Sequence, residues 1–358
     1  MKKSLFFLAA AAVALASCSN DEVVSQNTTT NQPKEIAFAP LNLPSTRTTI
    51  VNGTVFPSDY NFYIAAYSAA PTPAGDYFGK TEYTNEATTT IWSGVSGQKR
   101  YWPLGDATLN FLAITKAGAR TTTFNATHPA NSVVVDFTDN SAIATQHDLM
   151  WSYAQATVAQ VGNGISFNNG GSAGVSPVNM TFQHAESQIN FKVKAGNQVT
   201  EDAGLTLTSI TLNDGNYAGT YTLTFSDYAS TSAPATPTGV WSGVTDPTTS
   251  NPDVVAPQTT ANMAITQTSG ASVIGDGILV VPNPNKTADN LNESFKSFTV
   301  AYKMNGNDYT YTYTPDDAQR RLVPDTKYGF DITMTLQEIK VDASVEEWTP
   351  TSDTAVSM

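Results

Sequence analysis

The chain has 358 residues and a formal net charge of −13 at pH 7, and only 14% of its residues are charged. This acidic balance disfavours nucleic-acid binding, which needs Lys and Arg against phosphate, and it disfavours attachment to anionic lipid by charge. The single cysteine excludes an internal disulfide, so the fold has to be stabilised by burial.

Residues 1–17 have the form of a cleavable export signal. Two lysines precede an apolar run, residues 5–14, that is too short to span a bilayer. The run leads into Leu15-Ala16-Ser17-Cys18, which has the form of a lipobox, where the cysteine is acylated (palmitate is one such acyl group) and the peptide is cut before it. Loss of the two lysines changes the formal charge from −13 to −15. We therefore expect a lipid at Cys18, followed by a flexible lipidated linker over residues 18–33.

Alternatives remain open in this region. One alternative is that the leader is an ordinary secretory signal and that the cysteine is incidental or buried. The stretch Ser19-Asn20-Asp21-Glu22, acidic at its last two residues, resembles the signal that sends lipoproteins of Bacteroidetes to the outer face of the outer membrane. A solvated linker is the competing interpretation. Later segments lack the apolar length to cross a membrane, so the lipid is the expected anchor.

The first predicted strand covers residues 34–39, with Ile36 and Phe38 on one face. Residues 44–49 break this strand from the body of the chain. Arg47 is the only Arg or Lys between Lys34 and Lys80, so the loop is a candidate site for an arginine-specific protease. Spacing alone favours an ordinary loop arginine.

A boundary between two domains is predicted near residues 161–177, which are rich in Gly, Asn and Ser. This divides the mature chain into domains at residues 34–177 and 178–358. Strands are predicted around the alternating Ile189, Phe191 and Val193, and on both sides of a turn at residues 213–216. Residues 229–257 lack strand patterning and are predicted to be a long insertion in the second domain.

The last predicted strands are the most regular. Tyr309, Tyr311 and Tyr313 alternate with threonines, and the turn pair Asn305-Gly306 joins them to an alternating strand before it, which predicts a hairpin. The apolar parity then changes near residues 337–338, which indicates a bulge or a sharp turn. Since helical periodicity is lacking over any long stretch, the predicted fold class is all-β, built of sandwiches.

The sequence offers few residues for chemistry. The three histidines are not at metal-ligand spacing, and His184 lies on a predicted strand, which favours a hydrogen-bonded structural role. There is no nucleophile elbow or phosphate-binding loop, so we expect no catalytic residues, no metal and no cofactor. Trp92, Trp102 and Trp151 are expected in the core, and Trp241, within the predicted insertion, is the best candidate for an exposed aromatic.

Several blocks, taken in order, resemble the fimbrillins of Bacteroidales. The matching blocks are Arg100-Tyr101-Trp102-Pro103-Leu104-Gly105 with residues 109–113, Asp148-Leu149-Met150-Trp151-Ser152, residues 180–191, residues 207–220 and residues 322–348. In the last block Pro324-Asp325-Thr326 departs from the usual glycine. Each block is weak alone, and their order behind a lipobox is more specific.

This resemblance implies two tandem transthyretin-like β-sandwich domains and a structural, non-enzymatic role in type V pili, which function in adhesion. It implies a lipid-anchored precursor at the outer membrane and cell surface, trimmed after an arginine in the first loop, a position that Arg47 occupies. Residues 34–47 would then be the removable strand and cleavage loop. The expected partners are other pilus subunits and an arginine-specific protease.

The resemblance also implies strand exchange, in which the C-terminal segment, residues 339–358, fills the groove of another subunit with Val345 and Trp348 in its pockets. The competing interpretation makes residues 339–345 a resident last strand. A surface glycan-binding lipoprotein of the outer membrane, with an exposed aromatic platform and a glycan or host ligand, is the alternative function, and a secreted hydrolase is a third option.

Overall fold

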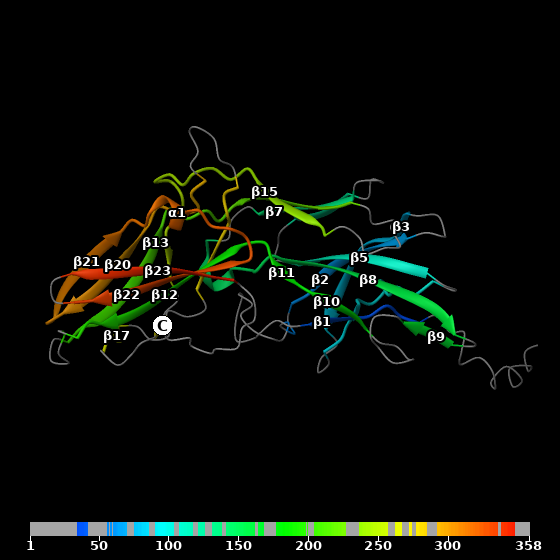
Figure 1. Cartoon of the computed structure of the whole chain (residues 1–358), viewed down its shortest axis with the longest axis horizontal. Helices are drawn as coiled ribbons and strands as arrows, with labels where there is room; N and C mark the ends of the chain where they lie inside the picture. The colour runs from blue at the N-terminus through cyan, green and yellow to red at the C-terminus, as the bar shows by residue number, and fades with distance from the viewer. Residues whose placement is uncertain are drawn as a thin grey trace, which may run out of the picture.

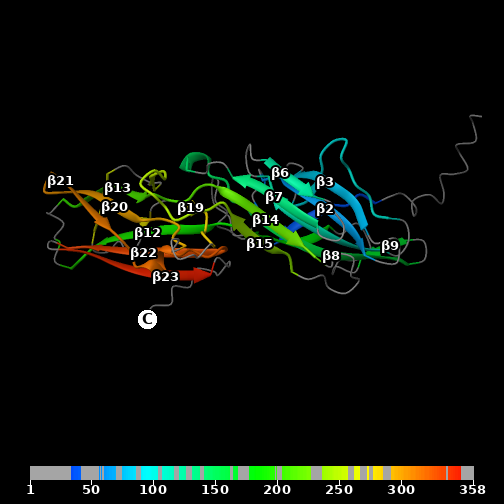
Figure 2. The same cartoon turned by 90° about the horizontal axis from the view of Figure 1, so that it is seen from above.

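The computed structural model describes the chain in separate ranges, and Figures 1 and 2 show how these ranges are arranged. Within them, no helix is long and apolar enough to cross a membrane. The described residues are 34–41, 56, 58, 60–69, 75–85, 90–103, 107–116, 121–125, 131–137, 141–161, 164–167, 177–197, 199, 204–226, 236–256, 262–266, 272–273, 277–284, 292–335 and 338–347.

The first sheet has nine strands in the order β10-β1-β4-β3-β2-β5-β8-β11, with β9 paired to β8. The bounds are β1 Phe38–Leu41, β2 Phe62–Ala69, β3 Gly75–Asn85, β4 Trp92–Gly94, β5 Ala107–Thr115, β8 Met150–Val161, β9 Gly164–Phe167, β10 Val178–Thr181 and β11 Gln183–His184. Strand β10 also approaches β8, so the sheet curls around one core. That core is rich in aromatic rings, among them Phe62, Tyr83 and Phe111.

A smaller bridging sheet, in the order β15-β14-β7-β6, covers the other face of the first sheet. Its strands are β6 Thr121–Asn125, β7 Asn131–Phe137, β14 Gly219–Phe225 and β15 Thr238–Ser242. Leu112 and Trp151 from the first sheet pack here against Val135, Leu223 and Trp241. The bridging sheet therefore joins strands from both sides of the expected boundary at residues 161–177 into one buried layer.

The remaining strands form a sandwich at the left of Figure 1. One sheet has the order β18-β12-β22-β23 with β19 on β12, and the other has the order β16-β13-β20-β21 with β17 on β13. The bounds are β12 Ser187–Ala195, β13 Thr206–Asn213, β16 Val254–Val255, β17 Met263–Ala264, β18 Ser272–Val273, β19 Ile278–Val280, β20 Ser297–Met304, β21 Asn307–Tyr313, β22 Thr326–Met334 and β23 Ile339–Glu347. Two short helices complete the described elements, η1 Ile143–Thr145 and α1 Asp317–Arg320.

The alternating apolar residues explain the core of this sandwich. Phe191 of β12, Phe298 of β20 and Phe330 of β22 come from the two facing sheets. The ring centroids lie 4.9 Å apart for Phe191 and Phe298 and 5.2 Å apart for Phe298 and Phe330. The all-β prediction is confirmed. The hairpin of β20 and β21 is also confirmed, and its turn has positive φ angles at Asn305 and Gly306, as a two-residue hairpin loop requires.

The predicted change of parity near residues 337–338 falls between β22 and β23, and residue 337 lies outside the described residues. Strands β22 and β23 pair antiparallel, and the Thr335 N–H donates to the Glu338 carbonyl oxygen at 2.9 Å. The turn predicted at residues 213–216 does not join two paired strands, because β13 and β14 on its two sides belong to different sheets. The chain crosses there from the sandwich to the bridging sheet.

The insertion predicted over residues 229–257 needs correction, because it contains β15 and β16. Strand β15 pairs with β14 along five residues, and Trp241 lies opposite Tyr221. Trp241 is 2% exposed, and its Nε1–H donates to the Ala185 carbonyl oxygen at 2.6 Å. The expected exposed aromatic is therefore a core residue. Trp92, Trp102 and Trp151 are also buried, as predicted.

Candidate functional site

Strand β1 and the residues just before it lie inside the first sheet, with partners on both sides. On one side β1 runs parallel to β10, and Phe38 is opposite Val178. On the other side the chain runs antiparallel to residues 92–102. There the Ile36 N–H donates to the Arg100 carbonyl oxygen at 2.7 Å, and the Trp102 N–H donates to the Lys34 carbonyl oxygen at 2.8 Å. Removing this strand would leave ladder groups on both neighbours without their present partners.

The two predicted strand residues point into the core. Ile36 and Phe38 are both 0% exposed. The Phe38 ring makes edge contacts with three other rings, at centroid distances of 6.3 Å to Phe62, 4.9 Å to Tyr83 and 5.1 Å to Phe111. Because those rings come from β2, β3 and β5, Phe38 occupies a groove that the rest of the domain builds.

The rim of this groove is polar. The Glu35 Oε2 atom lies 2.8 Å from Lys99 Nζ, and the two side chains are 24% and 44% exposed. The neighbouring Arg100 is held in place because its Nε–H donates to Thr81 Oγ1 at 3.2 Å. The Tyr83 hydroxyl is buried and makes no hydrogen bond with the described residues. Burial, and then the nearby Glu35 carboxylate, raise the pKa of Tyr83.

Strand β23, the start of the predicted donor segment, is an edge strand. Within the described residues it pairs only with β22, where Val345 lies opposite Tyr328. Ile339 and Val341 pack partly against the sandwich core. Val345 is 66% exposed although Tyr328, its partner, is buried. The end of β23 therefore contributes little to the core.

Three of the predicted site residues lie outside the described residues. These are the lipidation site Cys18, the cleavage site Arg47 and the donor residue Trp348. They remain predictions. The structure does describe Ile36, Phe38 and Val345, and it places the first two in the groove and the third on the exposed edge strand.

The predicted structural role of His184 is confirmed. Its Nδ1 atom lies 2.9 Å from Asp148 Oδ2, and the side chains are 2% and 0% exposed. The His184 N–H donates to Asp325 Oδ1 at 3.1 Å. This buried cluster fixes β11 against β8 and against the chain before β22. Asp148 and Asp325 are far from His184 in the sequence and share no spacing motif with it, so sequence reasoning missed both partners.

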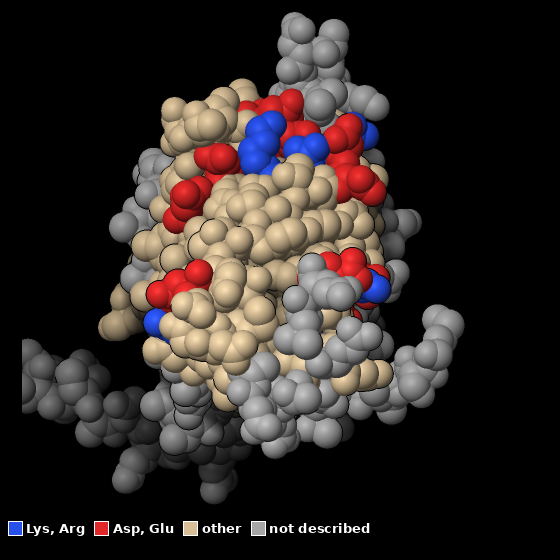
Figure 3. Space-filling model, turned by 90° about the vertical axis from the view of Figure 1, so that its left-hand side faces the viewer, with Lys and Arg blue, Asp and Glu red and all other residues tan. Residues whose placement is uncertain are grey.

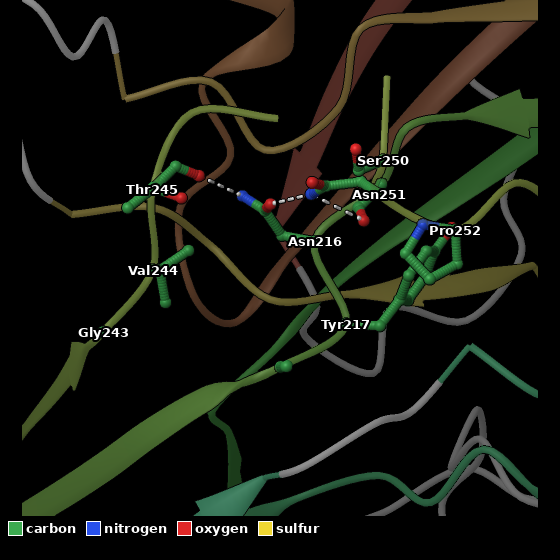
Figure 4. A pocket seen from close by; sticks show the side chains of 10 residues that line it. Asn216, Tyr217, Gly243, Val244, Thr245, Ser250, Asn251 and Pro252 are labelled. Atoms are coloured by element: carbon green, nitrogen blue, oxygen red, sulfur yellow. Dashed lines mark hydrogen bonds between the residues drawn. The ribbon is translucent and has the colours of Figure 1, made fainter. Parts of the chain in front are cut away.

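One open pocket, with a volume of about 360 Å³, lies where the chain crosses from β13 to β14 (Figure 4). Asn216 and Asn251 line it. The Asn251 Nδ2–H donates to Asn216 Oδ1 at 2.9 Å, and the Asn216 Nδ2–H donates to the Thr245 carbonyl oxygen at 3.3 Å. These amide groups are engaged with one another and with backbone, so the pocket is explained as a polar crossing of the chain and carries no ligand assignment.

The far end of the sandwich does not concentrate the negative charge of the chain. Figure 3 shows acidic and basic side chains beside one another around a broad uncharged area. Ion pairs in the sandwich include Lys303 with Asp308 at 3.1 Å and Lys340 with Glu338 at 3.1 Å. A partner attracted by charge of one sign is therefore not favoured at this end. The described residues also contain no cluster of three His, Cys, Asp or Glu suited to a metal ion.

Comparison with known proteins places this chain in a family. A family model described as fimbrillin-like matches residues 46–348. No relative among the curated proteins matches the chain. A solved fimbrial protein of Bacteroides vulgatus is similar, at 16% identity over 80% of this chain and 93% of that one, with a TM-score of 0.47. A cell adhesion protein of Bacteroides uniformis is similar at 17% identity over 88% and 99%, with a TM-score of 0.46. Since the family model spans most of its length, the chain belongs to the fimbrillin-like family.

Proposed function

We propose that this chain is a structural subunit of a surface pilus that assembles by strand exchange. The precursor is held at the outer membrane by a lipid on Cys18, and a protease cuts after Arg47. The segment before the cut leaves, and the C-terminal segment of another subunit takes its place. The observation that carries the proposal is the position of β1, an N-terminal strand that is paired on both sides and inserts Phe38 into the core.

The position of Arg47 supports the first step. It stands six residues after Leu41, the last residue of β1, so a cut there separates β1 covalently from the body. The same cut separates Cys18, and any lipid on it, from residues 48–358. After cleavage the segment of residues 34–41 would be held by its ladder, by the burial of Ile36 and Phe38 and by the ion pair of Glu35 with Lys99. A strand with longer apolar contacts can displace it, because an open groove with unpaired backbone groups is a template for another strand.

The exposure of β23 supports the second step. Its outer edge faces no other described strand, and Val345 is mostly exposed, so the C-terminal segment has apolar surface left to bury. At about 25 cal/mol per Å² of apolar surface, moving such side chains into a groove is favourable. In this structure β23 is paired with β22, which is the state expected before exchange.

The proposal is tested by expressing the chain from Ser19, adding an arginine-specific protease, and following mass and oligomer size. We expect a single early cut after Arg47, followed by a series of oligomers of increasing size that resist warm detergent. The matched control is Arg47→Lys, which keeps the charge and removes the cleavage site. A cut protein that stays monomeric, or an Arg47→Lys variant that assembles equally well, would contradict the proposal.

The structure does not support the aromatic platform on which the glycan-binding alternative depended. It called for an exposed aromatic platform, and Trp241, the candidate for that role, is buried against Phe137 and Tyr221.

A further inference from the structure

Among the described residues, one ion pair joins the segment of residues 34–41 to the groove that it occupies. Glu35 is the only acidic residue in the segment 34–41, and it meets Lys99 at 2.8 Å. Its second oxygen, Oε1, is buried and makes no hydrogen bond with the described residues. The backbone fixes this contact from both sides, because Ile36 and Lys34 are hydrogen-bonded to Arg100 and Trp102.

The basic side of this contact belongs to the body of the domain. Lys99 and Arg100 lie in the segment after β4, and Arg100 is positioned by Thr81 of β3 and by the Phe78 ring, 5.6 Å from its guanidinium carbon. Tyr83, whose hydroxyl lies near Glu35, is anchored in the core. If residues 34–41 leave, Lys99 loses this carboxylate, while Arg100 keeps its contacts with Thr81 and Phe78 and Tyr83 keeps its place in the core. A basic residue at this point would bring a like charge beside Lys99.

We propose that Lys99 and Arg100, with the Tyr83 hydroxyl, form a carboxylate-binding rim that selects the strand entering the groove, and that the occupant is the C-terminal segment of a second copy with Glu347 in the place of Glu35. This inference rests on the strand exchange proposed above. It adds the partner and the residue by which the groove recognises it.

The sequence of the C-terminal segment supports this occupant. Residues 339–358 contain four acidic residues and one lysine. In the resident strand the acid comes directly before a large inward-facing apolar residue, as Glu35 precedes Ile36. In the C-terminal segment only Glu347 is followed directly by a large apolar residue, Trp348. The pair Glu347-Trp348 therefore offers a carboxylate and an apolar anchor in the same order.

The experiment uses a fluorescent peptide of residues 339–358, added while the chain from Ser19 is trimmed by the protease. Four combinations are compared: the wild-type peptide, the E347K peptide, and a D353K peptide of the same net charge, each with wild-type protein, and the E347K peptide with K99E protein. Retention of the peptide on the trimmed protein is measured by anisotropy and by detergent-resistant complexes. Near-UV circular dichroism of uncut K99E protein checks that the variant folds.

We expect E347K to weaken binding to wild-type protein by about five- to tenfold, D353K to change it less than about twofold, and K99E to restore binding of E347K. Equal binding of the wild-type and E347K peptides would overturn the carboxylate rim and leave strand exchange standing. A stronger effect of D353K than of E347K would overturn the assignment to Glu347. Failure of the wild-type peptide to bind trimmed protein would overturn both this inference and strand exchange.

Discussion

Replacing Phe38 with alanine tests whether β1 is a permanent or a temporary part of the fold. Phe38 is 0% exposed and contacts the rings of Phe62, Tyr83 and Phe111. A Phe→Ala change at a closed core site costs about 3–5 kcal/mol, because burial is lost and a cavity remains. With three ring partners, we expect the uncut variant to lose about 4 kcal/mol of unfolding free energy.

The informative measurement compares the same variant before and after cleavage at Arg47. If the cut segment leaves, trimmed wild-type and trimmed Phe38→Ala proteins are the same molecule, residues 48–358, and their urea unfolding curves coincide. The variant also releases the strand sooner, so its assembly after cleavage begins earlier. The matched control is Phe111→Ala, which removes a ring that contacts Phe38 from the body of the domain and stays in the protein after trimming.

A difference of about 4 kcal/mol that persists after trimming would refute this reasoning, because it would mean that β1 stays in the groove. So would a Phe38→Ala precursor as stable as wild type, since the core described around Phe38 would then not depend on that ring. The Phe111→Ala variant should remain destabilised in both states, and its recovery on trimming would point to an artefact of the assay.

Four further substitutions test the fold and the groove. Tyr83→Phe removes a buried hydroxyl that has no hydrogen bond with the described residues, so thermal unfolding should show a precursor that is stabilised by about 1 kcal/mol. Burial raises the pKa of Tyr83 above its ordinary value of 10.0, so this tyrosine ionises at lower pH in the unfolded chain than in the folded chain. The contribution of Tyr83 to the free energy of unfolding is therefore fully present below pH 10.0 and is lost as the pH rises above it. Urea titrations of Tyr83→Phe should show a smaller loss of stability over that pH range. Asp148→Ala leaves His184 buried without its carboxylate and should cost about 3 kcal/mol in urea unfolding at neutral pH; an unchanged midpoint would show that the pair does not stabilise the fold. Gly306→Ala places a Cβ in open space at a φ of +78° and should lower the free energy of unfolding by about 1 kcal/mol. Gly277→Ala, at a φ of +85°, places a Cβ 2.7 Å from the Ile189 carbonyl oxygen and should lower it clearly more. Equal losses in the two variants would contradict the packing around Gly277.

Local patterns in the sequence were enough for some elements. Tyr309 to Tyr313 alternate strictly, and Asn305-Gly306 supplies the positive φ angles of the turn, so the hairpin is visible within one short window. Ile36 and Phe38 are predicted on one face because a strand has a period of two. In each case the information that specifies the structure lies within a few neighbouring residues.

The features that the sequence did not predict depend on pairing between distant segments of the chain. Strand β15 is short and set among Thr, Ser and Pro, and what makes it a strand is its ladder with β14 and the burial of Trp241 beneath Ala185. The partners of His184 are likewise brought in by the fold, since Asp148 precedes it by 36 residues and Asp325 follows it by 141. The charged rim is of the same kind, because Lys99 meets Glu35 across 64 residues.

The bridging sheet has a mechanical consequence. Strand β7 comes from the first half of the chain and β14 from the second, and they pair antiparallel from Asn131 opposite Phe225 to Phe137 opposite Gly219. Figure 2 shows both strands running obliquely along the long axis of the molecule. Ladder hydrogen bonds lie perpendicular to their strands, so a pull along this axis loads them in shear, many at once, instead of opening them one after another. A molecule built in this way resists stretching along its length better than two domains joined by a single linker.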